Sequence, residues 1–218
     1  MWDWGNAMKK ILIHGSGHKA DSWRQTVSHM AGGEDILCPE LSALLRGRPA
    51  SFENLSAGFA EYCGRLDGPL HLCGLSLGGI LALDYALRFP ERMATLALIG
   101  TPDRIPRLAF ALQNLVFRLL PRSAFASMAF DKRDTFALGG SMAGLDLGSR
   151  AEEVRCPALV LCGEKDRANL PAARRLAETI PGAELRVLPG AGHVVNEEAP
   201  AELARLLDGF YARHGQTP

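Results

Sequence analysis

A serine flanked by glycines is the residue of this sequence best suited to nucleophilic chemistry. Ser76 lies at the centre of segment 74–78, which reads Gly-Leu-Ser-Leu-Gly, after the apolar run 70–73 and before the helix-forming stretch 79–88. Glycines at a strand-to-helix turn let the backbone bend sharply, so the hydroxyl stands exposed above the end of a sheet in a nucleophile elbow. Such a short segment also occurs by chance, so the prediction depends on a base and an orienting acid elsewhere.

The base and the acid both follow later apolar runs. His193 ends the flexible segment Gly-Ala-Gly-His at 190–193, and Asp166 ends the segment Gly-Glu-Lys-Asp at 163–166. A serine hydroxyl needs an imidazole to take its proton and a carboxylate to hold that imidazole. The three residues occur in the chain order Ser, Asp, His, and we predict that Ser76, Asp166 and His193 form a catalytic triad.

Alternating strands and helices must position these residues. Six short runs rich in Val, Ile, Leu and Cys are near-continuous, which is typical of parallel strands covered on both faces. Segments with apolar residues three and four apart lie between them and predict helices. The order favours an α/β fold: a three-layer sandwich around a mostly or wholly parallel six-stranded sheet, with its ligand crevice at the carboxyl ends of the strands. The predicted strands are 11–14, 35–38, 70–75, 95–100, 158–163 and 184–188, and the predicted helices are 22–30, 52–65, 80–88, 172–179 and 200–212, with Ser51 and Pro200 as helix starts.

The interval 103–150 interrupts this alternation. It carries apolar residues at helical spacing over 104–120, a second candidate helix over 123–130 and a glycine-rich piece around 139–148. An excursion after the carboxyl end of a strand lies over the active face, so we expect a small cap inserted in a single domain of residues 1–218. The alternative is a helix pair packed on the flank of the sheet.

Length and composition are those of a soluble globular protein. The 218 residues suffice to bury a core, and 24 basic residues balance 24 acidic ones, so nothing favours nucleic acid or an anionic membrane surface as a partner. No stretch approaches the roughly 20 apolar residues that span a bilayer, which predicts no integral membrane association. The five cysteines lack zinc-type or C-x-x-C spacing and are expected to be buried thiols of a cytoplasmic protein. We expect no metal, no organic cofactor, and a monomer or homodimer.

Taken together, these motifs resemble the α/β-hydrolase superfamily, in particular its compact bacterial esterase and lactonase-like members. The resemblance covers nearly the whole chain, through His14 and Gly15 after the first strand, the serine elbow, and segments 157–166 and 190–200. It implies a sheet of the hydrolase type with the triad at the ends of its strands.

The resemblance also implies a mechanism. His193 would take the proton of Ser76 as the hydroxyl attacks an acyl carbonyl, and the backbone amides of Ser16 and Leu77 would form the oxyanion hole. His14 resembles the buried family histidine that braces the loop of this hole. We therefore expect a carboxylesterase-like serine hydrolase (EC 3.1.1) that cleaves a small acyl substrate through an acyl-enzyme. Acyl transfer, lactone opening, carbon–carbon bond cleavage and non-catalytic binding of a small ligand are alternatives on the same fold.

The chain departs from the family in three places. The first predicted strand begins at residue 11, so the usual leading pair of strands is missing. The loop after the second strand reads Glu40, Leu41, Ser42 where relatives commonly carry Asp-x-x-Gly-x-Gly. The cap is short, which leaves a pocket that is either small or open.

Several residues keep two interpretations. Asp103, just after the fourth predicted strand, and Glu164 are alternatives to Asp166 as the triad acid. His18 either lines the mouth of the pocket or lies in a surface loop.

Residues of the excursion also have two interpretations. Arg104 and Arg107 either bind a substrate carboxylate or form a solvated cationic face. A set of apolar side chains either packs in the core or lines the substrate site: Leu108, Phe110, Leu112, Leu115, Val116 and Phe117.

Overall fold

A six-stranded parallel sheet forms the centre of the molecule. The computed structural model describes residues 8–105 and 128–214. Its strand order is β2-β1-β3-β4-β5-β6, and every neighbouring pair is parallel. The strands are β1 (Lys10–Ile13), β2 (Ile36–Leu37), β3 (Leu70–Leu75), β4 (Met93–Ile99), β5 (Ala158–Gly163) and β6 (Glu184–Leu188). The predicted α/β class and its six parallel strands are confirmed.

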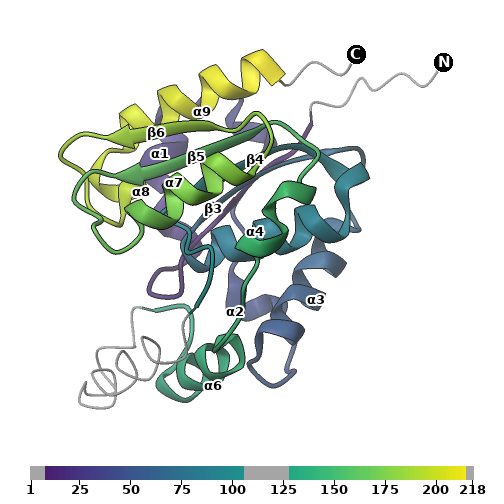
Figure 1. Ribbon diagram of the computed structural model, residues 1–218. Helices are drawn as coiled ribbons and strands as arrows, with labels where there is room; N and C mark the ends of the chain where they lie inside the picture. The colour runs from purple at the N-terminus through teal and green to yellow at the C-terminus, as the bar shows by residue number, and fades with distance from the viewer. Residues whose placement is uncertain (1–7, 106–127, 215–218) are drawn as a thin grey trace.

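Helices cover both faces of this sheet (Figure 1). The helices α1 and α9 pack together on one face, while α3 and α4 pack together on the other, where α7 covers β5. Successive strand residues point to opposite faces, so Ile11 and Ile13 enter the core beneath α3 and α4, while Leu12 enters the core beneath α1 and α9. Burial on both faces explains why the strand sequences are almost continuously apolar.

The longer helices lie close to their predicted positions. Ser51 accepts a hydrogen bond from the Asn54 backbone N–H at 3.2 Å and so caps α3, as its position in the sequence indicates. Helix α4 begins three residues earlier than predicted, at Leu77, because the chain turns directly from Ser76 into the helix. The α-helices are α1 (Arg24–His29), α2 (Leu41–Leu44), α3 (Phe52–Cys63), α4 (Leu77–Arg88), α6 (Lys132–Met142), α7 (Leu170–Thr179), α8 (Val195–Glu198) and α9 (Pro200–His214), and the 3₁₀ helices are η1 (Ala20–Trp23), η2 (Gly33–Asp35), η3 (Pro90–Arg92) and η5 (Gly148–Glu153).

Helix α6 lies in the excursion and overlaps the predicted glycine-rich piece only at residues 139–142; no element was predicted over 132–138. Asp131 caps it by accepting from the Asp134 N–H at 2.8 Å, and Leu138 and Met142 are buried in the same core as α3. Ser141 accepts from the Phe52 N–H at 2.8 Å, which ties α6 to the start of α3. These tertiary contacts offset the low helix propensity of its glycines.

The two ends of the excursion are pinned to each other. Arg104 and Asp146 form an antiparallel bridge, in which the Ile105 N–H donates to the Leu145 carbonyl at 2.8 Å. Figure 1 shows α6 lying beyond α2 and α3, away from the sheet. The candidate helix over 123–130 lies mostly outside the described residues, and 128–130 form a bend. A cap over 103–150 therefore stays a prediction.

Candidate active site

Ser76 stands at a strained turn between β3 and α4. Its backbone has φ 54° and ψ −114°, a conformation that residues other than glycine rarely adopt. A Cβ at Gly74 would overlap the carbonyl of Gly78, and a Cβ at Gly78 would overlap the carbonyl of Ile13. The Ser76 side chain makes no capping hydrogen bond to α4, so the turn presents a hydroxyl that helix capping does not engage. This is the geometry of the predicted elbow.

Asp166 and His193 are hydrogen bonded to each other. Nδ1 of His193 lies 2.6 Å from Oδ2 of Asp166. A carboxylate oxygen can only accept, so Nδ1 carries the proton and Nε2 is the nitrogen left to act as a base. The carboxylate is buried, with 5% of its side chain exposed, whereas the imidazole is 38% exposed. A buried carboxylate thus contacts a partly exposed imidazole.

The end of β4 links Ser76 to this pair. The Ser76 N–H donates to the Ile99 carbonyl at 2.9 Å. The next residue, Gly100, has φ +51°, and a Cβ built on it would lie 3.1 Å from Nδ1 of His193 and 3.2 Å from Oδ2 of Asp166. Two consecutive residues at the end of β4 therefore lie next to the serine and next to the imidazole–carboxylate pair. The structure places Ser76, Asp166 and His193 around the same strand end.

The two alternative acids have other partners. Arg175 donates to Asp103 through Nε at 2.7 Å and through Nη2 at 2.8 Å. Burial alone would raise the pKa of Asp103, but the hydrogen bonds and charge of Arg175 lower that pKa below its ordinary value. Glu164 accepts from the Gly190 N–H at 2.9 Å. Asp166 is the acid that contacts His193.

Two side chains that hold this pair were not found by sequence reasoning. Asn169 contacts the Asp166 carboxylate, and Glu198 accepts from the backbone N–H groups on both sides of His193, those of Gly192 at 2.7 Å and Val194 at 3.0 Å. Both residues are polar and lie three and five positions after a predicted triad residue. That proximity was the available signal.

The loop after β1 lies against the elbow. A Cβ on Gly15 would lie 3.5 Å from Cβ of Ser76, so the backbone beside Ser16 approaches the serine closely. Across from it, α4 begins at Leu77, whose N–H belongs to the first helical turn and has no acceptor within the helix. The amides of Ser16 and Leu77 thus belong to the two segments that flank Ser76.

His14 is fully buried and connects this loop to the loop after β2. Its Nε2 accepts from the Leu41 N–H at 3.1 Å, which places the proton on Nδ1, 2.8 Å from the Gly15 carbonyl. Glu40 approaches the same Nε2 at 3.2 Å and accepts from the Ala20 N–H at 3.1 Å. The altered loop after β2 therefore holds the loop that carries Ser16.

His18 is half-buried beside these residues rather than on an open surface loop. Its Nδ1 lies 3.6 Å from the Cβ position of Gly15. Burial lowers the pKa of the His18 imidazole below its ordinary value; Glu197 opposes that shift, and the nearby His14 and His193 lower the pKa further. The position fits the interpretation in which His18 lines the mouth of the site.

Several residues of the excursion that the sequence singles out are not among the described residues. Arg107 and the six apolar residues at 108, 110, 112, 115, 116 and 117 lie outside the described residues. Arg104 is exposed, and it lines a hollow of about 310 Å³ with Asp103, Asp146 and Arg175. No residue of the Ser76, Asp166 and His193 group lines that hollow.

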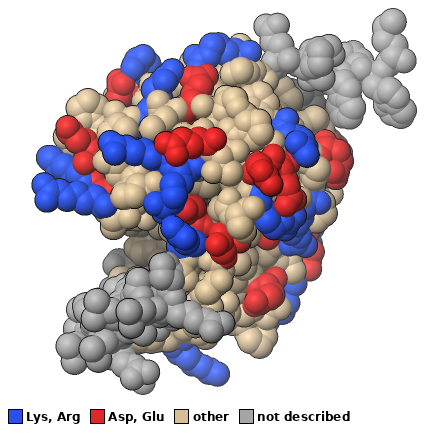
Figure 2. Space-filling model, in the orientation of Figure 1, with Lys and Arg blue, Asp and Glu red and all other residues tan. Residues whose placement is uncertain are grey.

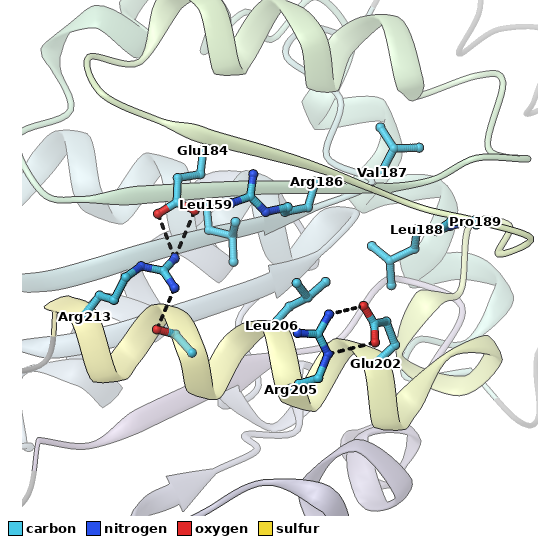
Figure 3. Close-up of a pocket in the computed structure, with 11 residues that line it drawn as sticks. Leu159, Glu184, Arg186, Val187, Leu188, Pro189, Glu202, Arg205, Leu206 and Arg213 are labelled. Atoms are coloured by element: carbon cyan, nitrogen blue, oxygen red, sulfur yellow. Dashed lines mark hydrogen bonds and ion pairs between the residues drawn. The ribbon is translucent and has the colours of Figure 1, made fainter.

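A second hollow of about 320 Å³ runs between β6 and α9 (Figure 3). Each of its three arginines contacts a glutamate of the wall: Arg205 contacts Glu202 at 2.5 and 3.0 Å, whereas Arg213 at 2.8 and 3.0 Å and Arg186 at 2.8 Å share Glu184. The described lining contains no serine, cysteine or histidine. The hollow therefore offers no nucleophile comparable with Ser76.

The surface carries charges of both signs, and most of the cysteines are buried. Lys and Arg side chains lie interspersed with Asp and Glu over most of the face seen in Figure 2. Four cysteines are buried and Cys38 is half-buried, where burial raises the pKa of its thiol to about 11. Of the helices in residues 8–105 and 128–214, none is both long and apolar enough to cross a membrane.

Known proteins share this sequence pattern and this architecture. The sequence profile of the alpha/beta hydrolase family matches residues 11–206. A putative 2-succinyl-6-hydroxy-2,4-cyclohexadiene-1-carboxylate synthase of Bacillus subtilis is 28% identical in an alignment 211 positions long that covers 78% of this chain and 76% of that protein. A pimeloyl-(acyl-carrier protein) methyl ester esterase of Aromatoleum aromaticum is 27% identical in an alignment 240 positions long that covers 91% of this chain and 96% of that protein.

Two solved structures show the same fold at low sequence identity. The enol-lactonase of Burkholderia xenovorans LB400 superposes with a TM-score of 0.77 at 21% identity and covers 97% of this chain and 94% of its own. NosK of Streptomyces actuosus superposes with a TM-score of 0.79 at 22% identity and covers 97% and 100%. Both comparisons extend over nearly the full length of the chains.

Proposed function

Because the chain belongs to the alpha/beta hydrolase family, we propose that it is a serine hydrolase that cleaves carboxylic esters or related small acyl compounds. The observation that carries this proposal is the 2.6 Å hydrogen bond between His193 and Asp166, next to a strand end that also binds the backbone of Ser76. Esterases among the relatives support the reaction class. The triad, the oxyanion donors and the substrate class are parts of the proposal.

The first half of the proposed reaction forms an acyl-enzyme. Nε2 of His193 removes the proton of Ser76 as Oγ attacks the acyl carbonyl, and the buried Asp166 carboxylate stabilises the resulting imidazolium. The carbonyl oxygen becomes negative and accepts from the N–H groups of Ser16 and Leu77, each donor contributing about 3 kcal/mol to the transition state. When the tetrahedral intermediate collapses, the imidazolium protonates the leaving alcohol.

The second half releases the acid. A water molecule gives its proton to Nε2 of His193 and attacks the acyl carbon, and the same two amides stabilise the second oxyanion. Collapse breaks the bond to Oγ of Ser76, which recovers its proton from His193. The carboxylic acid leaves, and the protein returns to its starting state without a net change in its own protons.

A fluorophosphonate probe tests the proposal without knowledge of the substrate. The probe phosphonylates a serine that a neighbouring base has activated, so the folded protein is expected to label at one site, and Ser76→Ala is expected to abolish labelling. Ser28→Ala, which removes an exposed serine hydroxyl from α1, is the matched control and is expected to label normally. Folded wild-type protein that does not label at Ser76 would exclude the enzyme and favour a ligand-binding role.

Relatives with other acyl chemistries define the substrate panel. A 2-hydroxymuconate semialdehyde hydrolase of Pseudomonas putida, which aligns over 96% of this chain at 28% identity, supports carbon–carbon bond cleavage as the second candidate reaction. Purified protein should be assayed on aryl esters of increasing acyl length, on lactones and on a vinylogous 1,5-diketone. The substrate with the highest kcat/KM then assigns the reaction on this site.

A further inference from the structure

Asn169 lies directly on the carboxylate of Asp166. Its side-chain Nδ2 is 3.0 Å from Oδ1 and 3.0 Å from Oδ2 of Asp166, and its backbone N–H donates to Oδ1 at 3.3 Å. The same Nδ2 is 3.3 Å from Nδ1 of His193. The amide therefore sits at the junction of the acid and the imidazole.

The local backbone fixes Asn169 at this junction. Asn169 directly precedes α7, and the N–H groups of Asn169 and Leu170 donate to the Asp166 carbonyl at 3.2 and 2.9 Å. The turn thus returns the side chain at position 169 to the carboxylate three residues earlier. The half-buried Asn169 thus contacts a buried carboxylate.

The hydrogen bonds of the carboxylate divide between two partners. Oδ2 accepts from Nδ1 of His193 and from Asn169, whereas Oδ1 accepts from the backbone and the side chain of Asn169. A carboxylate held through both oxygens cannot rotate about its Cβ–Cγ bond without losing donors. Nδ1 of His193 carries its proton toward Oδ2, so its contact with Nδ2 of Asn169 is one between two donors.

We propose that Asn169 is a positioning residue for the triad acid: it locks the Asp166 carboxylate in the plane that His193 requires. The inference rests on the proposed function, because the carboxylate matters to the reaction only if His193 is the base. Among the described residues, the Asn169 side chain contacts Asp166 and His193, and it acts on the reaction through Asp166. An amide can hold the acid without adding a second negative charge to it.

The test compares two substitutions at this position with one elsewhere. Asn169→Ala removes the amide, and Asn169→Asp keeps the shape but replaces the donor with a carboxylate. Asn54→Ala is the matched control, since Asn54 is also half-buried and donates through Nδ2 to a backbone carbonyl, that of Pro49 at 2.9 Å. The rate of fluorophosphonate labelling is measured for each folded variant between pH 5 and pH 9, with circular dichroism as the check on folding.

We expect Asn169→Ala to slow labelling by about tenfold to a hundredfold, the scale of a displaced catalytic group. The charged or titratable side chains facing His193 are Asp166 on the loop after β5 and His18 on the loop after β1, with Glu198 of α8 bonded to its flanking amides. Asn169→Asp adds a carboxylate next to Nδ1, which stabilises the imidazolium. The acidic limb of its rate profile is therefore expected to move to higher pH.

The outcomes separate the two proposals. If both variants at position 169 label at the wild-type rate, or slow equally with an acidic limb that does not move, Asn169 is only a packing residue and the inference is wrong. If Asn169→Asp alone keeps the wild-type profile, shape rather than the donor matters, which also overturns it. A wild-type protein that fails to label overturns the proposed function first and this inference with it.

Discussion

Nδ1 of His193 lies 2.6 Å from Oδ2 of Asp166, across the carboxyl ends of two strands and beneath a glycine that leaves room for both side chains. This contact decides which nitrogen of the imidazole carries a proton, because a carboxylate can only accept. The Asp166 carboxylate contacts the imidazole, whereas the Asp103 carboxylate is bound by Arg175. We therefore expect loss of Asp166 to affect activity and loss of the Asp103–Arg175 contact to affect stability.

The first prediction concerns the identity of the acid. Asp166→Asn keeps the size of the side chain but loses the charge that stabilises the imidazolium, so kcat for a good ester is expected to fall by about 10⁴-fold. Asp103→Asn is the matched control and is expected to leave kcat within a few-fold of the wild type. The measurement is steady-state ester hydrolysis. A larger loss in Asp103→Asn than in Asp166→Asn would reassign the acid.

The second prediction concerns the stability that Asp103 contributes. Arg175→Ala leaves a buried carboxylate without its bidentate partner, and we expect the free energy of unfolding to fall by about 1–3 kcal/mol. Because Arg175 lowers the pKa of Asp103, this contribution is present above the ordinary carboxyl pKa of about 4 and is lost as the pH falls through the lower folded value. Urea unfolding of the wild type and Arg175→Ala at pH 7 and pH 3 measures both effects. An equal difference at the two pH values would contradict the ion-pair account.

The fold could be predicted because the central strands of its sheet are buried on both faces. All six residues of β3 and of β5 are buried, so the sequence shows apolar runs that alternating half-buried strands would not give. Helix α6 could not be predicted in the same way, since Gly139 and Gly140 disfavour a helix and its stability comes from the Asp131 cap and from packing against α3. Its bounds depend on tertiary contacts.

Some residues of the candidate site could be predicted from the sequence, and others could not. Ser76, Asp166 and His193 could be predicted because each follows an apolar run, and parallel strands bring their ends to one edge. Asn169 and Glu198 were missed because their roles depend on loops that fold back by three to six residues, which periodicity does not describe. A polar residue shortly after a triad residue is a signal only when the turn between them is known.

The third prediction uses the glycine between the acid and the base. Gly100→Ala places a Cβ 3.1 Å from Nδ1 of His193 on a backbone with φ +51°, so both the pair and the backbone must shift. We expect a loss of about 1–3 kcal/mol in stability and at least a tenfold loss in kcat. Gly182→Ala is the matched control, because Gly182 has φ +69° with open space around its Cβ position. It should lose stability but keep kcat.

Thermal unfolding and ester hydrolysis distinguish the two glycine variants. The backbone penalty is common to both positions, whereas contact with His193 belongs to Gly100 alone. If Gly100→Ala keeps the wild-type kcat, the imidazole and carboxylate can separate without consequence, and their geometry does not limit the reaction.

The fourth prediction concerns the loop that carries His193. Glu198 accepts from the N–H groups of Gly192 and Val194, so Glu198→Ala leaves both donors on either side of the imidazole unpaired. We expect kcat to fall by about tenfold or more, because an error of about 1 Å in a catalytic group has that effect. Glu152→Ala, at an exposed glutamate in η5, is the control. Equal activity of the two variants would show that other contacts hold the loop.

The last prediction concerns a buried histidine far from this chemistry. His71 on β3 contacts Oγ1 of Thr95 at 2.9 Å and packs against the ring of Tyr211, with ring centres 4.9 Å apart. Burial, with a smaller contribution from the charge of Lys10, lowers the pKa of His71 from 6.5 to about 4. The folded protein therefore holds this imidazole neutral under conditions in which the unfolded chain protonates it.

The sign of the pH dependence follows from that difference. The contribution of neutral His71 to stability is complete above pH 6.5, the unfolded value, and is lost as the pH falls toward 4. Each pH unit within this window removes about 1.4 kcal/mol, so the wild type should lose about 2 kcal/mol more than His71→Gln between pH 7 and pH 5. Urea unfolding at the two pH values measures the difference, and the other histidines cancel in the comparison. Parallel losses in the two proteins would mean that His71 takes up a proton inside the folded core, which its contacts with Thr95 and Tyr211 argue against.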